Sequence, residues 1–445
     1  MDASQLNWLS ATDAARAIRD GAIGSEQLTE ACLARVREVD DQVQAWAFLD
    51  PEHALNQARA RDQARREGRP SGPLHGVPVA IKDIIDTEDM PTEDGCALHA
   101  GRTPVRDATV VAMLRAAGAV IFGKTVTTEL ATYAPGKTRN PHNPEHTPGG
   151  SSSGSAAAVA AGMVPLALGS QTNGSVIRPA SFCGVYGFKP THGLIPRTGV
   201  LKLSRTLDHV GVFARNLEDV ALLCEQLIGW DEDDPDTRPR ARPALVETAC
   251  AEPPLPPQVA FVKGPAWERA GAEAKEALAE LVAALGDQIF EVDLAESTSP
   301  ALDYHRTIME SEMAANLDRE WERGRERLSA SLRAQLERGR AVTALDYQRA
   351  LARIALLNAG LEDIFERCES IVTPAAAGTA PHGLESTGDP AFCSLWTLCG
   401  MPALNLPLMR GANGLPLGVQ LVGPRGGDAR LLRTARWLAA RVAAG

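Results

Sequence analysis

Short apolar runs alternate along this chain with segments of helical periodicity, and this alternation limits the folds that are open to it. The run VPVAIKDII (77–85) is rich in β-branched residues, as expected of a buried strand. It is followed by the amphipathic segment ATVVAMLRAAG (108–118) and by a second short apolar run, AVIFG (119–123). Strands that alternate with helices in this way indicate an α/β fold, in which helices cover both faces of a central mixed sheet.

The same alternation continues over the rest of the 445 residues. Helices are predicted within residues 1–65, where Ser10 and Ser25 are candidate caps, and within the charged stretch 300–365. The proline-rich stretch 237–258 predicts an exposed connection inside one large domain rather than a domain boundary. Further predicted elements are a helix at AAAVAAGMV (156–164), strands at ESIVTP (369–374) and LPLGVQLVG (415–423), and a terminal helix from residue 428.

Composition argues against several classes of partner. The formal charge is −11 and no block of Lys or Arg is present, so a nucleic-acid partner is not expected. No run approaches the roughly 18 apolar residues of a membrane span, and MDASQLNWLS has no secretory features. The eight cysteines are scattered without a CxxC pair, which favours reduced thiols in the cytoplasm over zinc or disulfides. We expect no metal and no cofactor.

Two motifs match enzyme signatures but stand in the wrong context. Residues 118–125 fit the phosphate-loop pattern, yet a helix precedes them and their variable positions form a strand, whose amides are committed to a sheet. Residues 150–154 fit GxSxG with Ser152 at the centre, but that motif needs a strand directly before it. The preceding NPHNPEHTPG contains three prolines, so an α/β-hydrolase elbow is not expected either.

Lys82, at the end of the strand GVPVAIKD, is the first of three features with catalytic potential. Burial disfavours the charged form of an amine, so a lysine in this place can be a neutral base. Alternatively, its stem could pack in the core while its head reaches the carboxylate of Asp83 or Asp86.

The other two features are glycine-rich turns that carry serines. In PGGSSSGSAAAVAAG (148–162) the glycines can hold a serine in an unusual backbone geometry, although Ser153 or Ser155 could simply cap the alanine-rich helix. In GSQTNGSVIRP (169–179) a tight turn over residues 172–175 would aim successive N–H groups at one point. Such a turn can stabilise the oxyanion of acyl transfer, or it can be an ordinary connection.

Together these stretches resemble the amidase signature family. The resemblance covers the chain from about residue 25 to the end, and its matches are co-linear. It implies the amidase signature fold as one domain over 1–445, with the signature core at 70–200 and a variable, substrate-binding helical region at 300–365. The matching stretches are GVPVAIKD, DATVVAMLRAAGAVIFGKTVTTELA, PGGSSSGSAAAVAAG, GSQTNGSVIRPASFCGVYGFKPTHGLIPR, CGMPALNLPL and GLPLGVQLVGP.

The resemblance implies a Ser–cis-Ser–Lys triad that works through an acyl-enzyme. Ser175 would be the nucleophile, Ser151 the bridging residue after a cis peptide bond, and Lys82 the base. Ser152 would add a supporting hydrogen bond. The backbone N–H groups of the second turn would form the oxyanion hole, which comprises Thr172, Asn173, Gly174 and Ser175.

Three positions of the second turn depart from the family pattern. Gln171 stands where the family commonly has Asp, and Asn173 replaces the second glycine of the turn. Arg178 follows the nucleophile by three residues, whereas the family's Arg often follows by two. These departures bear on any Asp–Arg pair in the site.

The resemblance implies hydrolysis of small-molecule amides, with aryl amides or carbamates (urethanes) as further substrates and a homodimer as a compatible assembly. The alternative is the amide-transfer (A) subunit of a tRNA-dependent amidotransferase, which has the same triad but supplies ammonia within a complex. A binding protein without catalysis is disfavoured, because all three triad positions are retained. The predicted substrate pocket, apolar and aromatic in character, comprises Tyr304, Met309, Met313, Phe392 and Trp396.

Overall fold

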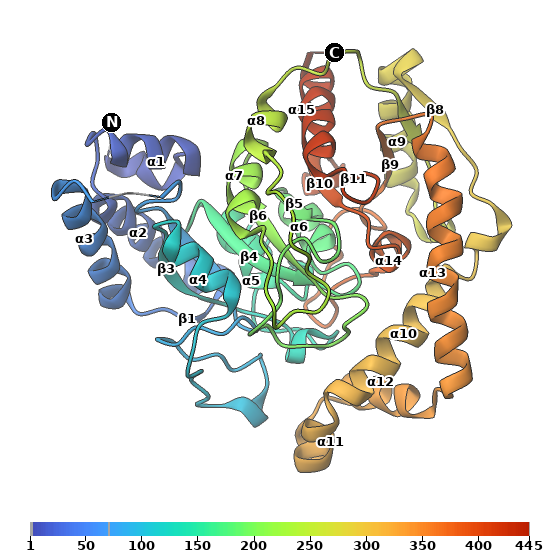
Figure 1. Ribbon diagram of the computed structural model, residues 1–445, viewed down its shortest axis with the longest axis horizontal. Helices are drawn as coiled ribbons and strands as arrows, with labels where there is room; N and C mark the ends of the chain where they lie inside the picture. Colours follow the sequence, from blue (N-terminus) through green and yellow to red (C-terminus); the bar gives the residue numbers. More distant parts are fainter. Residues whose placement is uncertain (1–2, 70–71, 445) are drawn as a thin grey trace.

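A mixed sheet of 11 strands runs through the computed structural model, which describes residues 3–69 and 72–444 (Figure 1). Its strands are β1 (Trp46–Phe48), β2 (Pro78–Lys82), β3 (Val120–Thr125), β4 (Leu166–Gln171), β5 (Tyr186–Lys189), β6 (His209–Ala214), β7 (Val259–Phe261), β8 (Ile289–Glu291), β9 (Ser370–Pro374), β10 (Ala403–Arg410) and β11 (Pro416–Val422). Their order in the sheet is β1-β3-β2-β4-β6-β5-β10-β11-β9-β7-β8. β2 pairs in parallel with β3 and β4, and β7 with β8 and β9, whereas the other neighbours are antiparallel.

Helices cover both faces of this sheet. They are α1 (Ala11–Arg19), α2 (Ser25–Val43), α3 (Pro51–Arg66), α4 (Thr109–Ala116), α5 (Ser153–Ala160), α6 (Ile177–Cys183), α7 (Leu217–Leu227), α8 (Leu245–Cys250), α9 (Ala272–Leu285), α10 (Ala301–Asn316), α11 (Asp318–Gly324), α12 (Ala330–Ala341), α13 (Ala344–Phe365), α14 (Ala391–Leu398) and α15 (Asp428–Ala444). α5 and α6 pack together against β4, β5 and β10, while α7 packs with α4 and α15. The predicted α/β fold with a central mixed sheet is therefore confirmed.

Two elements lie where the sequence did not indicate them. β1 interrupts the N-terminal helices and pairs with β3. The connection 237–258 is largely exposed as predicted, but it contains α8. Leu245 and Ala249, four residues apart, form the buried face of α8, which packs against α7 and α15. Two apolar residues at helical spacing thus give this short helix a buried face within the proline-rich connection.

One of the two predicted helix caps is confirmed and the other is wrong. Ser10 caps α1, because its hydroxyl oxygen accepts the N–H of Asp13 at 2.9 Å. Ser25 is instead the first residue of α2 and does not cap it. The carboxylate of Asp62 accepts the N–H groups of Ser25 and Glu26 at 2.8 and 3.0 Å, so a neighbouring helix satisfies these amides.

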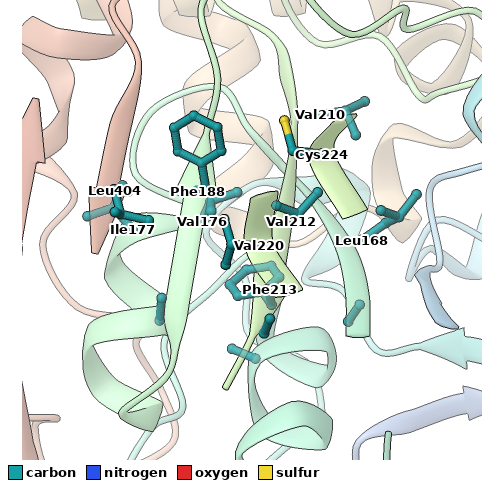
Figure 2. Close-up of a cluster of buried hydrophobic side chains, with 14 of the residues drawn as sticks. Leu168, Val176, Ile177, Phe188, Val210, Val212, Phe213, Val220, Cys224 and Leu404 are labelled. Atoms are coloured by element: carbon teal, nitrogen blue, oxygen red, sulfur yellow. The ribbon is translucent and has the colours of Figure 1, made fainter. Parts of the chain in front are cut away.

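The hydrophobic core lies directly behind the turn that carries Ser175. Figure 2 shows Val176 and Ile177, the next two residues, among apolar side chains of the sheet and its helices, including Phe188 and Val212. Both residues are completely buried. Burial of such a side chain stabilises the fold by about 1.5–3 kcal/mol. The turn is therefore anchored in the hydrophobic core.

Helices α10 to α13 fill the predicted helical stretch 300–365 and extend away from the sheet (Figure 1). α10 packs against α12, α13 and α14, so it joins this helical region to the rest of the domain. Among the described residues, no helix combines the length and hydrophobicity that a bilayer span requires.

Candidate active site

The site forms where two neighbouring parallel strands end. β2 ends at Lys82, and β4, which pairs in parallel with β2, ends at Gln171. Because parallel strands end at the same edge of a sheet, Lys82 lies beside Ser170 and beside the turn that leads from β4 into α6. The sheet itself therefore brings the lysine to the glycine-rich turn.

The Lys82 amine is fully buried and touches two serine hydroxyls. Its Nζ lies 2.7 Å from Ser151 Oγ and 2.8 Å from Ser170 Oγ. Desolvation holds the pKa of Lys82 well below its ordinary value, opposed only in part by the charge of Asp208. A neutral amine has a lone pair that can accept the Ser151 proton, while its own N–H donates to Ser170.

The alternative role of Lys82, as an ion-pair partner of a nearby carboxylate, is not realised. Asp83 lies instead 3.8 Å from the amine of Lys124, and Asp86 pairs with Arg102 at 2.8 Å. Within the described part of the chain, Lys82 forms no ion pair.

The serine-rich stretch supports the lysine from the other side. The Gly150–Ser151 peptide bond is cis. Ser152 Oγ accepts the Ser170 N–H and donates to the Ser170 carbonyl, both at 3.2 Å, and so holds the second partner of Lys82. Ser153 donates to the Val126 carbonyl instead of capping α5. Ser152 thus positions Ser170, while its supporting role in catalysis stays a prediction.

Two carbonyls of the Ser175 turn are fixed from outside. His305 Nε2 lies 2.9 Å from the Thr172 carbonyl oxygen, and burial lowers the pKa of His305 to about 4, so a neutral ring donates this bond. Thr397 Oγ1 donates to the Asn173 carbonyl at 2.7 Å. Because the C=O and N–H of a trans peptide point in opposite directions, these bonds orient the N–H groups of Asn173 and Gly174. Within the described residues neither N–H has an acceptor, as an oxyanion hole requires.

Ser175 lies two residues before α6 and is nearly buried, with 9% of its surface exposed. No described residue forms a hydrogen bond with its hydroxyl, so the structure brings Lys82 to Ser151 but shows no bond from Ser151 to Ser175. Catalytic hydrogen bonds often tighten only when substrate is bound. The triad roles of these three residues stay a prediction.

Gln171 has a structural role that explains its departure from the family pattern. Its side-chain oxygen accepts the N–H groups of Val176 and Ile177 at 2.8 and 3.1 Å, and its Nε2 donates to Thr397 at 3.0 Å. The amide thus satisfies the first N–H groups of α6, as a carboxylate would, without adding a buried charge. Gln171 forms no pair with Arg178, which bonds to carbonyls instead.

We expect Gln171→Ala to lower the free energy of unfolding by about 1–3 kcal/mol, because two buried N–H groups lose their acceptor. Turnover should fall as well, since Ser175 precedes these amides directly. Urea unfolding with a steady-state assay would measure both effects. Gln171→Glu, which retains the acceptor oxygen, is expected to lose less of each. Wild-type stability in the alanine variant would contradict this role.

A cavity of about 470 Å³ opens next to the turn, and its wall is more polar than predicted. Of the five predicted pocket residues, Met309 lines it. Met313 and Trp396 are almost completely buried in the hydrophobic core. Tyr304 packs against the same core, and Phe392 lies in a smaller cluster with Ala266 and Ala391. Polar residues that line the cavity, and that the sequence did not single out, include Tyr133, Glu310, Arg338, Thr387, Asp389 and Ser394.

Asn173 forms part of this wall, and its side chain is held on both sides. Its Nδ2 donates to the Tyr133 hydroxyl at 3.1 Å, and its Oδ1 accepts from Ser394 at 2.7 Å. The residue that replaces a glycine of the family turn therefore adds a fixed polar side chain to the cavity wall beside the turn.

Comparisons with known proteins agree with this geometry. A family model described as Amidase matches residues 27–432. A glutamyl-tRNA(Gln) amidotransferase subunit of the A type, from Chloroflexus aurantiacus, is 36% identical, and the alignment covers 97% of this chain and 96% of that protein. The solved peptide amidase from Stenotrophomonas maltophilia is 28% identical with a TM-score of 0.85, covering 98% of this chain and 97% of that one.

A solved 6-aminohexanoate cyclic dimer hydrolase in complex with its substrate has a TM-score of 0.87 and 26% identity, with coverage of 98% and 97%. These relatives align over nearly the whole length of both chains. The matched stretch holds Lys82, both serine-bearing turns and the helices around the cavity. The chain therefore belongs to the amidase family, the enzymes of which act on carbon–nitrogen bonds.

Proposed function

We propose that this protein hydrolyses small-molecule amides through an acyl-enzyme on Ser175. The observation that carries the proposal is the contact of a fully buried Lys82 amine with Ser151 at 2.7 Å. A desolvated amine is a base near neutral pH, whereas an exposed lysine would be protonated. A purely structural lysine at this depth would be expected to have a carboxylate or several carbonyl partners, and Lys82 has two hydroxyls.

In the proposed mechanism Lys82 accepts the proton of Ser151, and Ser151 accepts that of Ser175 as its oxygen attacks the amide carbon. The N–H groups of Asn173 and Gly174 stabilise the negative oxygen of the tetrahedral intermediate. Ser151 then returns a proton to the leaving nitrogen, the C–N bond breaks, and the amine or ammonia departs. Water cleaves the ester at Ser175 through the same relay, which releases the acid and restores all three side chains.

The cavity wall supports small, polar substrates within this class. Tyr133, Asn173 and Ser394 present hydrogen-bonding groups close to the turn, while the apolar part of the wall is smaller and comprises Leu302, Met309, Pro390 and Ala391. We therefore propose primary amides of small molecules ahead of anilides and aryl carbamates, which need a larger apolar surface.

The second candidate is an amide-transfer subunit, and the curated relatives favour it more strongly than they favour a small-molecule hydrolase. Glutamyl-tRNA(Gln) amidotransferase subunits of the A type are 33–36% identical to this chain over at least 93% of its length. The chemistry at Ser175 would be the same in both cases. The two candidates differ in whether the chain turns over an amide alone or within a complex.

Turnover by the purified chain distinguishes them. We expect ammonia release from small primary amides, with little amine release from anilides or aryl carbamates, and with Ser175→Ala as the blank. Cleavage of anilides or carbamates instead would mean a larger apolar site than the cavity wall indicates. The alternative result is that the purified chain turns over none of these substrates and transfers an amide to glutamyl-tRNA(Gln) once companion subunits are added. That result would establish the second candidate and refute the first.

A further inference from the structure

Asp208 stands directly before β6, and three donors fix its carboxylate in place. Its Oδ1 accepts the Thr172 hydroxyl at 2.6 Å, and its Oδ2 accepts the backbone N–H groups of Leu203 and Ser204, each at 2.9 Å. Thr172 opens the turn that carries Ser175, so Asp208 ties this turn to the loop before β6. Within residues 3–69 and 72–444, no cation lies within ion-pair distance of this carboxylate.

A second cavity, of about 240 Å³, brings the carboxylate close to the proposed base. Its wall includes Asp208, Thr172 and Ser170. The hydroxyl of Ser170 lies 2.8 Å from Lys82 Nζ, so one residue of this wall touches the base and another touches the carboxylate. Charges act more strongly on each other across an apolar wall than across water. Apolar residues that line this cavity include Ile84, Ala131, Val200, Leu201 and Leu203.

The charge of Asp208 persists at neutral pH and acts on the lysine. Burial raises the pKa of Asp208 to about 6, so its carboxylate is ionised above that pH. Desolvation lowers the pKa of Lys82, and the negative charge of Asp208 opposes this effect. The two groups therefore interact electrostatically without forming a contact ion pair.

Other titratable groups around this pair are already compensated, neutral or exposed. Arg197, which donates to the Asp208 carbonyl at 3.1 Å and favours its ionised carboxylate, pairs with Asp234 and Asp236 at 2.8 and 2.6 Å. On the lysine side, Asp83 faces Lys124. Burial keeps two neighbouring histidines neutral by lowering their pKa values: His209 and His305. Two further cations of the cavity wall have exposed side chains: Lys202 and Arg205.

We propose that Asp208 supplies the negative charge that stabilises Lys82 once the relay has protonated it. This inference rests on the proposed amide hydrolysis and adds a positioning residue to its machinery. When Ser175 attacks, Lys82 becomes a cation whose two contacts, Ser151 and Ser170, are neutral, and a buried cation without a counter-charge is costly. A carboxylate in direct contact would keep the amine protonated in the resting state. A fixed carboxylate farther away leaves the amine neutral and still stabilises the cation when it forms.

The pH profile of Asp208→Asn tests this role. We expect the midpoint of the rise in kcat/KM to move to lower pH by about one unit and the plateau to fall by about tenfold, because the lost charge makes Lys82 a weaker base. Asp219→Asn is the matched control, since Asp219 also accepts a threonine hydroxyl and two backbone N–H groups, those of Ala11 and Thr12. It should change neither quantity. Lower turnover at an unmoved midpoint in Asp208→Asn would mean a structural role and overturn the inference.

Asp208→Ala covers the case in which asparagine disturbs the loop by turning its amide N–H₂ group toward the N–H groups of Leu203 and Ser204. The truncated side chain leaves room in the cavity for a small anion. Formate should therefore raise kcat/KM of Asp208→Ala by about tenfold, because it restores the missing charge. It should have no such effect on Lys82→Met, which lacks the base. Absence of rescue in Asp208→Ala would contradict the proposed role.

A stability measurement separates this inference from the proposed function. If the wild type cleaves no amide, the proposed function fails, but the interaction of the two charges can still be measured. The wild type should gain stability over Lys82→Met as pH rises, and in the Asp208→Asn background this gain should begin at lower pH, because the pKa of Lys82 in the folded state falls further. An unchanged onset in urea unfolding curves would overturn the inference whatever the turnover shows.

Discussion

The Ser175→Ala variant is expected to lose at least about a thousandfold in kcat/KM for every amide that the wild type cleaves. Without the hydroxyl no acyl-enzyme can form, and the oriented N–H groups have no oxyanion to stabilise. The fold should remain intact, because Gln171, His305 and Thr397 hold the turn through its backbone and not through the Ser175 side chain.

Steady-state turnover and urea unfolding of the same preparation measure both parts of this expectation. Ser153→Ala is the matched control, since Ser153 is a buried serine of the other glycine-rich stretch whose hydroxyl donates to the Val126 carbonyl. It should lose about 1 kcal/mol of stability and keep most of its turnover. Residual activity above about one-thousandth in Ser175→Ala would assign the nucleophile to another residue.

Much of the fold could be predicted because the relevant signals are local. The apolar run 77–85 contains β2, the run 119–123 covers the first four residues of β3, and the periodic segment between the two runs contains α4. The motif at 118–125 is not a phosphate loop, as expected, since residues from Val120 to Thr125 are a buried strand. β1 has only three residues, too few to show an alternating pattern, which is why local patterns do not reveal it.

Only those site residues that lie in glycine-rich turns or at strand ends could be predicted from the sequence. Whether the Lys82 amine faces Asp83 or Ser151 depends on the packing of β2 against β4 and α5, which no local pattern encodes. The pocket prediction relied on aromatic and methionine side chains, and such residues at helical spacing are most often part of the core. The contacts of Asn173 with Tyr133 and Ser394 join positions up to 221 residues apart, so tertiary packing alone creates them.

The Lys82→Met variant is expected to lose turnover to a similar extent, about a thousandfold or more, because the stem is retained while the base is lost. In the wild type, kcat/KM should rise with pH and then level off, since only the neutral amine can accept the Ser151 proton. Desolvation holds the pKa of Lys82 well below that of a free lysine, so the plateau should begin far below pH 10.5. The methionine variant should show no such rise.

The same shift predicts a pH-dependent stability. The folded state has the lower lysine pKa, so the unfolded state binds more protons between that pKa and 10.5, and the free energy of unfolding should rise with pH across this window. Lys82→Met removes this contribution. Unfolding curves at several pH values should therefore show the wild type gaining stability relative to the variant as pH rises.

Lys189 offers a control that separates burial from catalysis. It is also fully buried, its pKa is lowered to about 7 by desolvation, and it donates to the carbonyls of Pro190 and Met401, away from the serines. Lys189→Met should change the pH dependence of stability in the same direction as Lys82→Met but keep the rise of kcat/KM with pH. Two outcomes would contradict the role of Lys82 as the base: loss of that rise in Lys189→Met, or retained turnover in Lys82→Met. In either case the burial of Lys82 would serve the fold alone, and another residue would have to be the base.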